Sequence, residues 1–398
     1  MIVFAVAALL PTYLIRFRIG PFPTTLLEII LLAAIAILII HSFCHPRENG
    51  GPEKKIKNVF LHFLDSRLRG NDKLLFIGSI LIIVATIIGI VVAPDHRAAL
   101  GIAKAYFWEP MLLAWLLIAA KPDRNKITKA AIYGFGLSAL VIIVYGLIQY
   151  VHPALIPPTW MAERRITSVF DYPNAAALYL APLVPLALAV PFGFIFSLFA
   201  FLIIILAKSA GGLIAIAAAL FFLGIVNKKT RLPSIVIAII VASVVIFTPA
   251  AGLRDQILMR DWSGRVHQIG WTESLAMLHD HPLFGAGLDA FKTVVAPYHH
   301  AQGVEIFQYP HDIFLTVWSE LGLLGLAGFA CIMIWFFKNG ITPPLPSPIV
   351  GEEVKKRWAN KFLVAAMIAI LVHGLVDVPY FKNDLAMMFW LFIVLMAV

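Results

Sequence analysis

The chain has 398 residues, of which 61% are hydrophobic and only 13% are charged. Soluble domains usually carry about 25% charged residues, so this composition excludes an ordinary soluble protein. The formal net charge of +9 does not indicate a nucleic-acid partner, because much of the basic charge lies in loops between apolar segments, where membrane proteins carry it. Cys44 and Cys331 lie far apart in the sequence and imply neither a disulfide framework nor a thiolate metal site.

Apolar runs of about 20 residues, the length that spans a bilayer as a helix, recur along the chain. Such runs must be helical, because backbone groups in lipid have to form hydrogen bonds within their own segment. We therefore predict an all-α polytopic membrane protein with about 12 transmembrane helices and one long outer loop that carries short helices. Short gaps near Pro191 and Ser209–Gly212 predict tight turns or breaks within a helix. The predicted spans are 1–15, 24–43, 74–93, 105–120, 131–151, 173–190, 192–207, 211–226, 233–251, 313–337, 361–380 and 383–398.

Lys and Arg residues gather in loops that fall on one side of the membrane when these spans are counted. The positive-inside rule assigns that side, with both termini, to the cytoplasm and the segment 252–312 to the outside. The four basic loops are 44–73, 121–129, 227–231 and 338–361.

Basic residues also occur on the predicted outer side of the membrane. Any single one of them is as well explained by anchoring at lipid headgroups. As a set, however, they suggest an outward-facing cavity for an anionic ligand on the outer leaflet. They are Arg16, Arg18, Arg97, Lys104, Arg164, Arg165, Arg254, Arg260 and Arg265.

An arginine pair precedes one of the predicted helices. Arg164 and Arg165 lead into a short polar turn, and a helix follows with Asp171 or Asn174 as its expected N-cap. Guanidinium groups beside a helix N-terminus favour phosphate binding. The alternative is a juxtamembrane pair that only anchors at headgroups.

The outer loop contains a predicted amphipathic helix that begins near Arg265. Its expected membrane-facing side is formed by Arg265, Ile269, Trp271, Leu275 and Leu278. We expect His281-Pro282 to end the helix, and Gly285 and Gly287 to shape the turn that follows. The alternative role for Arg265 is a cap or a salt bridge within the loop.

His311 lies where the outer loop re-enters the membrane at a predicted helix start. The positive end of a helix dipole favours a neutral imidazole, and a neutral histidine is a competent proton acceptor. The alternative is a histidine that only forms hydrogen bonds at headgroup level. Three glycines of the following helix, Gly322, Gly325 and Gly328, have a spacing suited to close helix packing.

Histidine clusters in the outer loop raise the question of a metal site. The groups His279-Asp280-His281 and His299-His300 match no zinc-ligand spacing. We therefore expect neither a metal nor another cofactor.

Several segments, in their order and spacing, resemble the O-antigen ligase and polymerase family of bacterial membrane glycosyltransferases. The resemblance is carried by PTYLIRFRIGPFPTTLLEI near the start, LGIAKAYFWEPMLL at 100–113, YGLIQY at 145–150, RRITSVFDYPNAAALYL at 164–180, the HPLFGAGLDAF block, the PHDIFLTVWSELGLLGL block and LVHGLVDVPYFKNDLAMMFW at 371–390.

This resemblance implies transfer of a glycan from an undecaprenyl-diphosphate carrier to an acceptor, lipid A–core oligosaccharide, at the periplasmic face of the bacterial inner membrane. It implies that Arg165 or Arg164, together with Arg265, holds the diphosphate. His311 would activate the acceptor hydroxyl, without a metal and with inversion at the anomeric carbon. The expected parts are N-terminal transmembrane helices over 1–251, a periplasmic loop with active-site elements over 252–312, and C-terminal transmembrane helices over 313–398.

The chain departs from the family pattern at two places. Asp312 stands where many relatives have asparagine; a neighbouring acid can raise the pKa of a histidine, and the sequence leaves open whether Asp312 changes the role of His311. Lys208-Ser209 stands where relatives often have Ser-Arg-Gly, so Lys208 is a candidate replacement for that arginine.

Three other functions stay open on the sequence. The same chemistry would serve a polysaccharide polymerase or a protein O-oligosaccharyltransferase, because acceptor choice depends on loop shape. A transporter of an anionic solute would need charged residues along its helices. Those helices are nearly free of charge, which favours an active site at the membrane surface over a transporter; the exceptions are Glu28, Glu109, Glu320 and Asp377. A catalytically inactive scaffold also stays open on the sequence.

Overall fold

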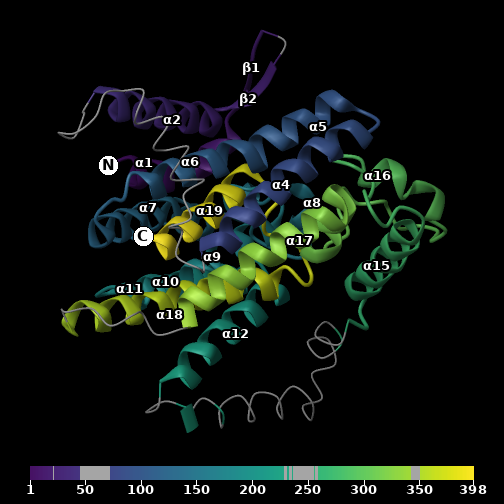
Figure 1. The fold of residues 1–398 in the computed structure, drawn as a ribbon. Coiled ribbons are helices and arrows are strands. Elements are labelled where there is room, and N and C mark those ends of the chain that lie inside the picture. The colour runs from purple at the N-terminus through teal and green to yellow at the C-terminus, as the bar shows by residue number, and fades with distance from the viewer. Residues whose placement is uncertain are drawn as a thin grey trace.

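The computed structural model describes residues 1–20, 22–44, 72–227, 231–232, 235, 255, 259–341 and 350–398 (Figure 1). It is 75% helix and 2% strand, which confirms a mostly helical fold. Among the described residues, four helices are long and apolar enough to cross a bilayer: Asp72–Val92, His96–Ala119, Arg124–Val151 and Ile313–Ile341. The count of about 12 spans and the three-part division stay predictions, and the span expected over 233–251 lies almost entirely outside the described residues.

The apolar helices vary in length because prolines and short turns interrupt them. Pro182 and Pro185 divide one predicted span into two short helices, since proline lacks an N–H donor for the helix ladder. The helices are α1 (Ile2–Ala8), η1 (Leu10–Leu14), α2 (Leu26–Cys44), α4 (Asp72–Val92), α5 (His96–Ile102), η2 (Ala103–Trp108), α6 (Glu109–Ala119), α7 (Arg124–Val151), η3 (Pro153–Leu155), α8 (Pro158–Met161), α9 (Pro173–Leu180), α10 (Leu183–Ala187), α11 (Gly193–Leu206), α12 (Ala210–Val226), α15 (Trp262–Asp280), α16 (Phe291–Val294), η4 (Ala296–Tyr298), α17 (Ile313–Ile341), α18 (Val350–His373) and α19 (Asn383–Ala397).

A β-hairpin before α2 was not predicted from the sequence. Strands β1 (Arg16–Ile19) and β2 (Phe22–Thr25) pair antiparallel and project from the helical body (Figure 1). The turn uses Gly20 at φ 59°, a left-handed conformation that glycine adopts without steric cost.

The longest helix, α17, is broken at Gly322, where φ is 67° and ψ is −172°. The backbone of the segment predicted to be the outer loop, which keeps that name below, enters this break. Leu323 N–H donates to Leu283 O at 3.0 Å, and Ala286 N–H donates to Ser319 O at 2.6 Å. The loop segment 281–291 is therefore hydrogen-bonded to a helix that is long and apolar enough to cross a membrane.

Glycines explain how closely these segments approach. As expected, Gly285 and Gly287 shape the turn after α15, with φ of +66° and +90°. Of the three α17 glycines named in the sequence analysis, Gly328 packs against another helix, because a Cβ there would lie 2.9 Å from Gly78 O in α4. A Cβ at Gly325 would instead meet a side chain of its own helix. The prediction of close helix packing thus holds at Gly328. Gly322 instead makes room for the backbone of the loop at Leu283.

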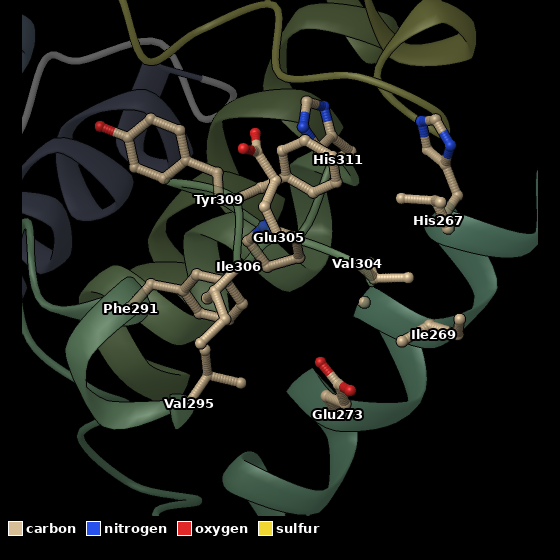
Figure 2. A pocket seen from close by; sticks show the side chains of 14 residues that line it. His267, Ile269, Glu273, Phe291, Val295, Val304, Glu305, Ile306, Tyr309 and His311 are labelled. Carbon is tan, nitrogen blue, oxygen red and sulfur yellow. The ribbon is translucent and has the colours of Figure 1, made fainter. Parts of the chain in front are cut away.

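The outer loop contains α15, as predicted, and side chains from α15 and from 304–311 line a pocket between them (Figure 2). The helix begins after Asp261, whose side chain accepts the Gly264 N–H, and it ends before His281-Pro282. The predicted membrane-facing side is only partly right. Leu278 is 1% exposed and belongs to the core, whereas Leu275 is 52% exposed.

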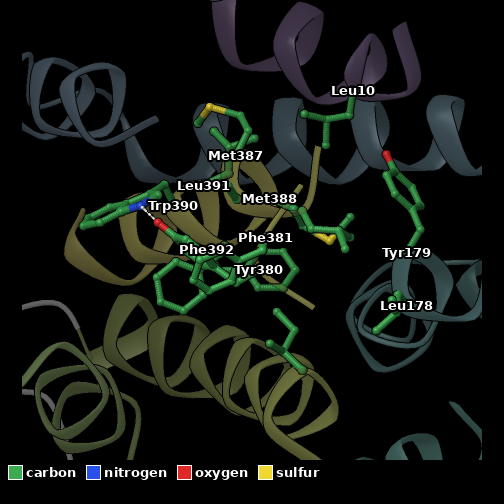
Figure 3. Packing of buried hydrophobic residues seen from close by; sticks show 14 of the residues in the cluster. Leu10, Leu178, Tyr179, Tyr380, Phe381, Met387, Met388, Trp390, Leu391 and Phe392 are labelled. Atoms are coloured by element: carbon green, nitrogen blue, oxygen red, sulfur yellow. Dashed lines mark hydrogen bonds between the residues drawn. The ribbon is translucent and has the colours of Figure 1, made fainter. Parts of the chain in front are cut away.

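The core of the molecule surrounds α19, in which every residue from Asn383 to Met396 is buried (Figure 3). A helix that is apolar all round can be stable only with protein or lipid on every side. Trp390 Nε1 donates to Tyr380 Oη at 3.0 Å, and Tyr380 Oη donates to Tyr106 O at 2.9 Å. These bonds fix the segment 374–382, which joins α18 to α19.

Candidate functional site

His311 lies at the junction between the outer loop and α17. Its φ of 55° is uncommon for a non-glycine residue and marks stored backbone strain, which clusters at functional sites. The next residue, Asp312, accepts the Leu315 N–H at 2.8 Å through Oδ1 and so caps the helix. The expectation that Asp312 acts on His311 is therefore not supported, because its carboxylate is turned to the helix backbone.

The acid that meets His311 is Asp377, in the segment between α18 and α19. Asp377 Oδ1 lies 3.5 Å from His311 Nδ1 and accepts the Val378 N–H at 2.8 Å. The Asp377 carboxylate, held by the Val378 N–H, is thus placed to orient the His311 ring.

A second histidine, His267 on α15, stands beside this pair (Figure 2). Its ring centroid lies 5.4 Å from that of His311. His267 Nε2 lies 3.0 Å from Val376 O, and Nδ1 lies 2.7 Å from Ser263 O. The contact with Val376 ties α15 to the same segment that carries Asp377.

The two arginines before α9 have different environments. Arg165 is half-buried. It donates from Nε to Ala207 O at 3.0 Å and from Nη2 to Asn174 Oδ1 at 3.1 Å, and its guanidinium stacks on Trp160 at 5.1 Å. Arg164 is exposed, and its φ is 51°. Arg165 therefore holds the turn together, whereas the guanidinium of Arg164 is open to a ligand.

The start of α9 differs from the expectation. The helix begins at Pro173 with Tyr172 at the N-cap, and no side chain caps it. The side chain of Asn174 accepts from Arg165 instead. Proline at the first helical position has no N–H that needs a cap.

Lys208 lies in the turn between α11 and α12, at the break that the sequence predicted there. Its Nζ donates to Glu163 O at 2.7 Å, so its charge lies next to the arginine pair. This placement supports the expectation that Lys208 replaces the basic residue of the family pattern. Ser209 caps α12 through a bond from the Gly212 N–H.

The turn after α11 also packs against the segment that carries Asp377. A Cβ at Gly211 would lie 2.8 Å from Val376 Cγ2 and 2.9 Å from His373 Cδ2. Contacts therefore run without interruption from Arg165 through the 207–211 turn to Val376, which is bonded to His267. The 207–211 turn, to which Arg165 is bonded, and His267 therefore both contact one short segment, 373–377.

Arg265 occupies a neighbouring face of α15. It is exposed and lines an open cleft of about 550 Å³, whereas His311 lines a narrower pocket on the adjacent face. Ile269 and Glu273 line both. The structure thus brings His311 to Asp377 and His267, and places Arg265 beside this group but outside the His311 pocket.

A further cation lies in the same region. Lys382 Nζ is 4.3 Å from the ring centroid of Tyr172, 5.6 Å from that of Phe170 and 5.9 Å from that of Tyr13. Cation–π contacts of this kind stabilise a desolvated ammonium. They join the segment after α18 to the turn before α9.

Sequence reasoning missed the roles of Asp377 and His267. Asp377 had a usable signal, because a charged residue among apolar segments is by default a functional candidate. His267 had none, since a histidine on an exposed loop helix is unremarkable until its neighbour is known. Among the described residues, no group of three or more His, Cys, Asp or Glu side chains is arranged to hold a metal, and a metal-free reaction stays a prediction.

Comparison with known proteins adds one finding. Residues 195–330 match a family model described as O-antigen ligase, and this range runs from α11 into α17. A search of curated proteins found no match. The matched range contains Lys208, Arg265, His267 and His311, and agrees with the motifs of the sequence. Over residues 195–330, this chain is therefore similar to the O-antigen ligase family.

Proposed function

We propose that the protein transfers a glycan from an undecaprenyl-diphosphate donor to a hydroxyl of lipid A–core oligosaccharide at the periplasmic face of the inner membrane. The observation that supports this proposal is the contact between His311, which lies within the family-matched range, and Asp377, which lies in the segment between α18 and α19. A carboxylate that accepts a hydrogen bond from Nδ1–H of an imidazole holds the ring in the tautomer and orientation in which Nε2 can abstract a proton.

In this proposal His311 is the general base. With Nδ1–H directed at Asp377, the lone pair of Nε2 is free to take the proton of the acceptor hydroxyl. The acceptor oxygen then forms a bond to the anomeric carbon as the bond from that carbon to the diphosphate oxygen breaks. The proton passes from His311 to solvent or to the released diphosphate, and the anomeric configuration is inverted.

Negative charge grows on the diphosphate oxygen as it leaves. Arg164, Lys208 and Arg265 supply positive charge for it, since guanidinium groups match phosphate oxygens in a bidentate manner. Removal of one such donor typically slows a reaction by about 10²–10³. Arg165 acts as a positioning residue, because its Nε and Nη2 groups are bonded to Ala207 and Asn174.

The test is reconstitution of purified protein in bilayers with undecaprenyl-diphosphate-linked glycan and lipid A–core. The expected product is a glycan joined to lipid A–core with inverted anomeric configuration, lost in His311→Ala. His279→Ala is the matched control, because His279 is 88% exposed at the far end of α15. Extension of the glycan on its own carrier would identify a polymerase, and solute movement without conjugate formation would identify a transporter.

A further inference from the structure

One face of α15 carries an open cleft. Of the residues that line it, the proposed reaction uses only Arg265, at one end. The cleft has a volume of about 550 Å³, within the range of pockets that hold small ligands. Helix residues at positions 265, 268, 272 and 276 line it, and their spacing of three and four residues places them on one face. These positions extend over about 16 Å along the helix axis, so the cleft is elongated.

The lining combines groups that recognise sugars. Gln268, Thr272 and His300 offer hydrogen-bonding groups, while Ile269 and Ala276 offer apolar surface. Gln268 Nε2 donates to Met259 O at 3.1 Å, which leaves its Oε1 free to accept. Sugar rings present hydroxyl groups at their edges and C–H groups on their faces, and a mixed lining of this kind matches both.

An aromatic side chain is held rigidly at the side of the cleft. Tyr298 Oη donates to Asp280 Oδ2 at 2.7 Å, which fixes the orientation of the tyrosine ring. A fixed ring provides large contact area with little loss of conformational entropy. Charge in the cleft is mixed, with Arg265 at one end and Glu273 along its side, so the cleft as a whole is not an anion site.

The cleft adjoins the pocket of His311, because Ile269 and Glu273 line both. Arg265 lies at the end of the cleft that is nearest His267, two residues further along α15. A donor whose diphosphate lies at Arg265 and whose first sugar faces His311 would have its further sugars beside Thr272, Ala276 and Tyr298.

We propose that this cleft binds the sugar units of the donor glycan beyond the one whose anomeric carbon reacts. The proposal rests on the proposed function and deepens it, since it makes α15 the element that selects donors by glycan length. Donors with several repeat units use the cleft, whereas a donor with a single sugar does not reach it.

The experiment compares Ala276→Trp, which fills the cleft, with Leu275→Trp. Leu275 is the neighbouring residue, 52% exposed and outside the cleft lining. Donors carrying one sugar and donors carrying several repeat units are compared with a fixed acceptor. We expect Ala276→Trp to lower kcat/KM for the long donor by about tenfold or more, and to leave the short donor and the thermal midpoint unchanged. Leu275→Trp should match the unmodified protein with both donors.

A second measurement does not need turnover. Repeat-unit oligosaccharides, released by mild acid from the lipid-linked glycan of the same cells, are tested for binding by saturation-transfer NMR. Binding that Ala276→Trp abolishes and Leu275→Trp retains supports the cleft. Equal effects of both variants, or a dependence on acceptor length instead of donor length, would overturn it. If the unmodified protein binds these oligosaccharides and transfers nothing, the proposed function fails while the cleft assignment stands.

Discussion

His311 has two acidic neighbours, and the structure gives them different tasks. Asp312 follows it in the chain and caps α17, whereas Asp377 comes from the segment after α18 and lies at 3.5 Å from its Nδ1. Contact in space, and not adjacency in sequence, therefore decides which carboxylate orients the imidazole.

This difference predicts unequal effects of two matched substitutions. Asp377→Asn removes the charge that orients His311, and we expect kcat for glycan transfer to fall by about 10². Asp312→Asn should cost little, because asparagine is as good an N-cap as aspartate. Kinetics of the reconstituted enzyme check this. Because the pair acts as a unit, His311→Ala combined with Asp377→Asn should be no slower than His311→Ala alone, and an additive loss would contradict the assignment.

The arginine pair allows a similar separation of stability from binding. Arg165→Gln leaves Ala207 O and Asn174 without a partner, which costs about 1–3 kcal/mol and lowers the thermal midpoint. Arg164→Gln should leave the midpoint unchanged, since Arg164 is exposed, and slow transfer by about 10²–10³. Thermal unfolding in detergent and transfer rates are measured on both proteins. A destabilised Arg164→Gln would show that this side chain also holds the fold.

Among the elements, the loop segment 281–291 and α17 form a single unit. The break at Gly322 frees a backbone N–H for the loop, and the loop in turn covers the opened helix. Motif glycines that precede His311 thus act by backbone fit and not by chemistry.

We expect this fit to tolerate no side chain at Gly285. A Cβ there would clash with the backbone O of Ser319, whereas at Gly303, which also has positive φ, nothing lies within 4 Å. Gly303→Ala should cost only the strain of a left-handed backbone, about 1–2 kcal/mol. Gly285→Ala adds the clash and should lower the thermal midpoint clearly further. Equal midpoints for the two variants would show that the loop is not seated as described.

The outer loop also contains a pH-dependent contact. His299 Nδ1 lies 3.0 Å from Glu273 Oε2, and this hydrogen bond raises the pKa of His299 above its usual value. A raised pKa in the folded protein gives stability that is fully present below the unfolded pKa of about 6.5 and is lost as pH rises through the folded pKa.

Hydrogen exchange of residues 296–304 should therefore become faster as the pH rises above about 6.5, by more than the increase that intrinsic exchange chemistry causes. Glu273→Gln should remove this extra dependence, because it removes the charged partner. The peptide of α8, which contains neither residue, is the internal control. An identical profile in Glu273→Gln would exclude the pair as its origin.

For the whole molecule, the orientation in the membrane can be tested directly. Cys44 and Cys331 are first replaced. A single cysteine is then introduced either at His300 in the outer loop or at Lys126 near the start of α7. Both positions are exposed. An impermeant maleimide should label His300→Cys in intact spheroplasts and Lys126→Cys only after permeabilisation. The reverse pattern would invert the proposed topology.

The sequence predicted those features that local chemistry determines. Pro282 ends α15, the turn at Ser209 separates α11 from α12, and Gly285 and Gly287 shape the following turn, because each depends on its own backbone. The hairpin at 16–25 was missed, since its four-residue strands are too short to show a period.

Contacts between distant segments could not be predicted. Asp377 meets His311, and Asn174 bonds Arg165 instead of capping its helix, only because of how the helices pack. The sequence therefore identified the chemical groups of the candidate site, but not the carboxylate that orients its histidine.

The central position of α19 has a consequence for biogenesis. This helix follows all other described helices in the chain, so they enter the bilayer before the helix that fills their centre has been made. Phe135 and Phe329 pack against Phe392 and Phe389 of α19, and before α19 is made, lipid tails would solvate these rings about as well as a protein helix does. Because α19 holds the segment that carries Asp377, we expect His311 and Asp377 to come together only after α19 has been inserted.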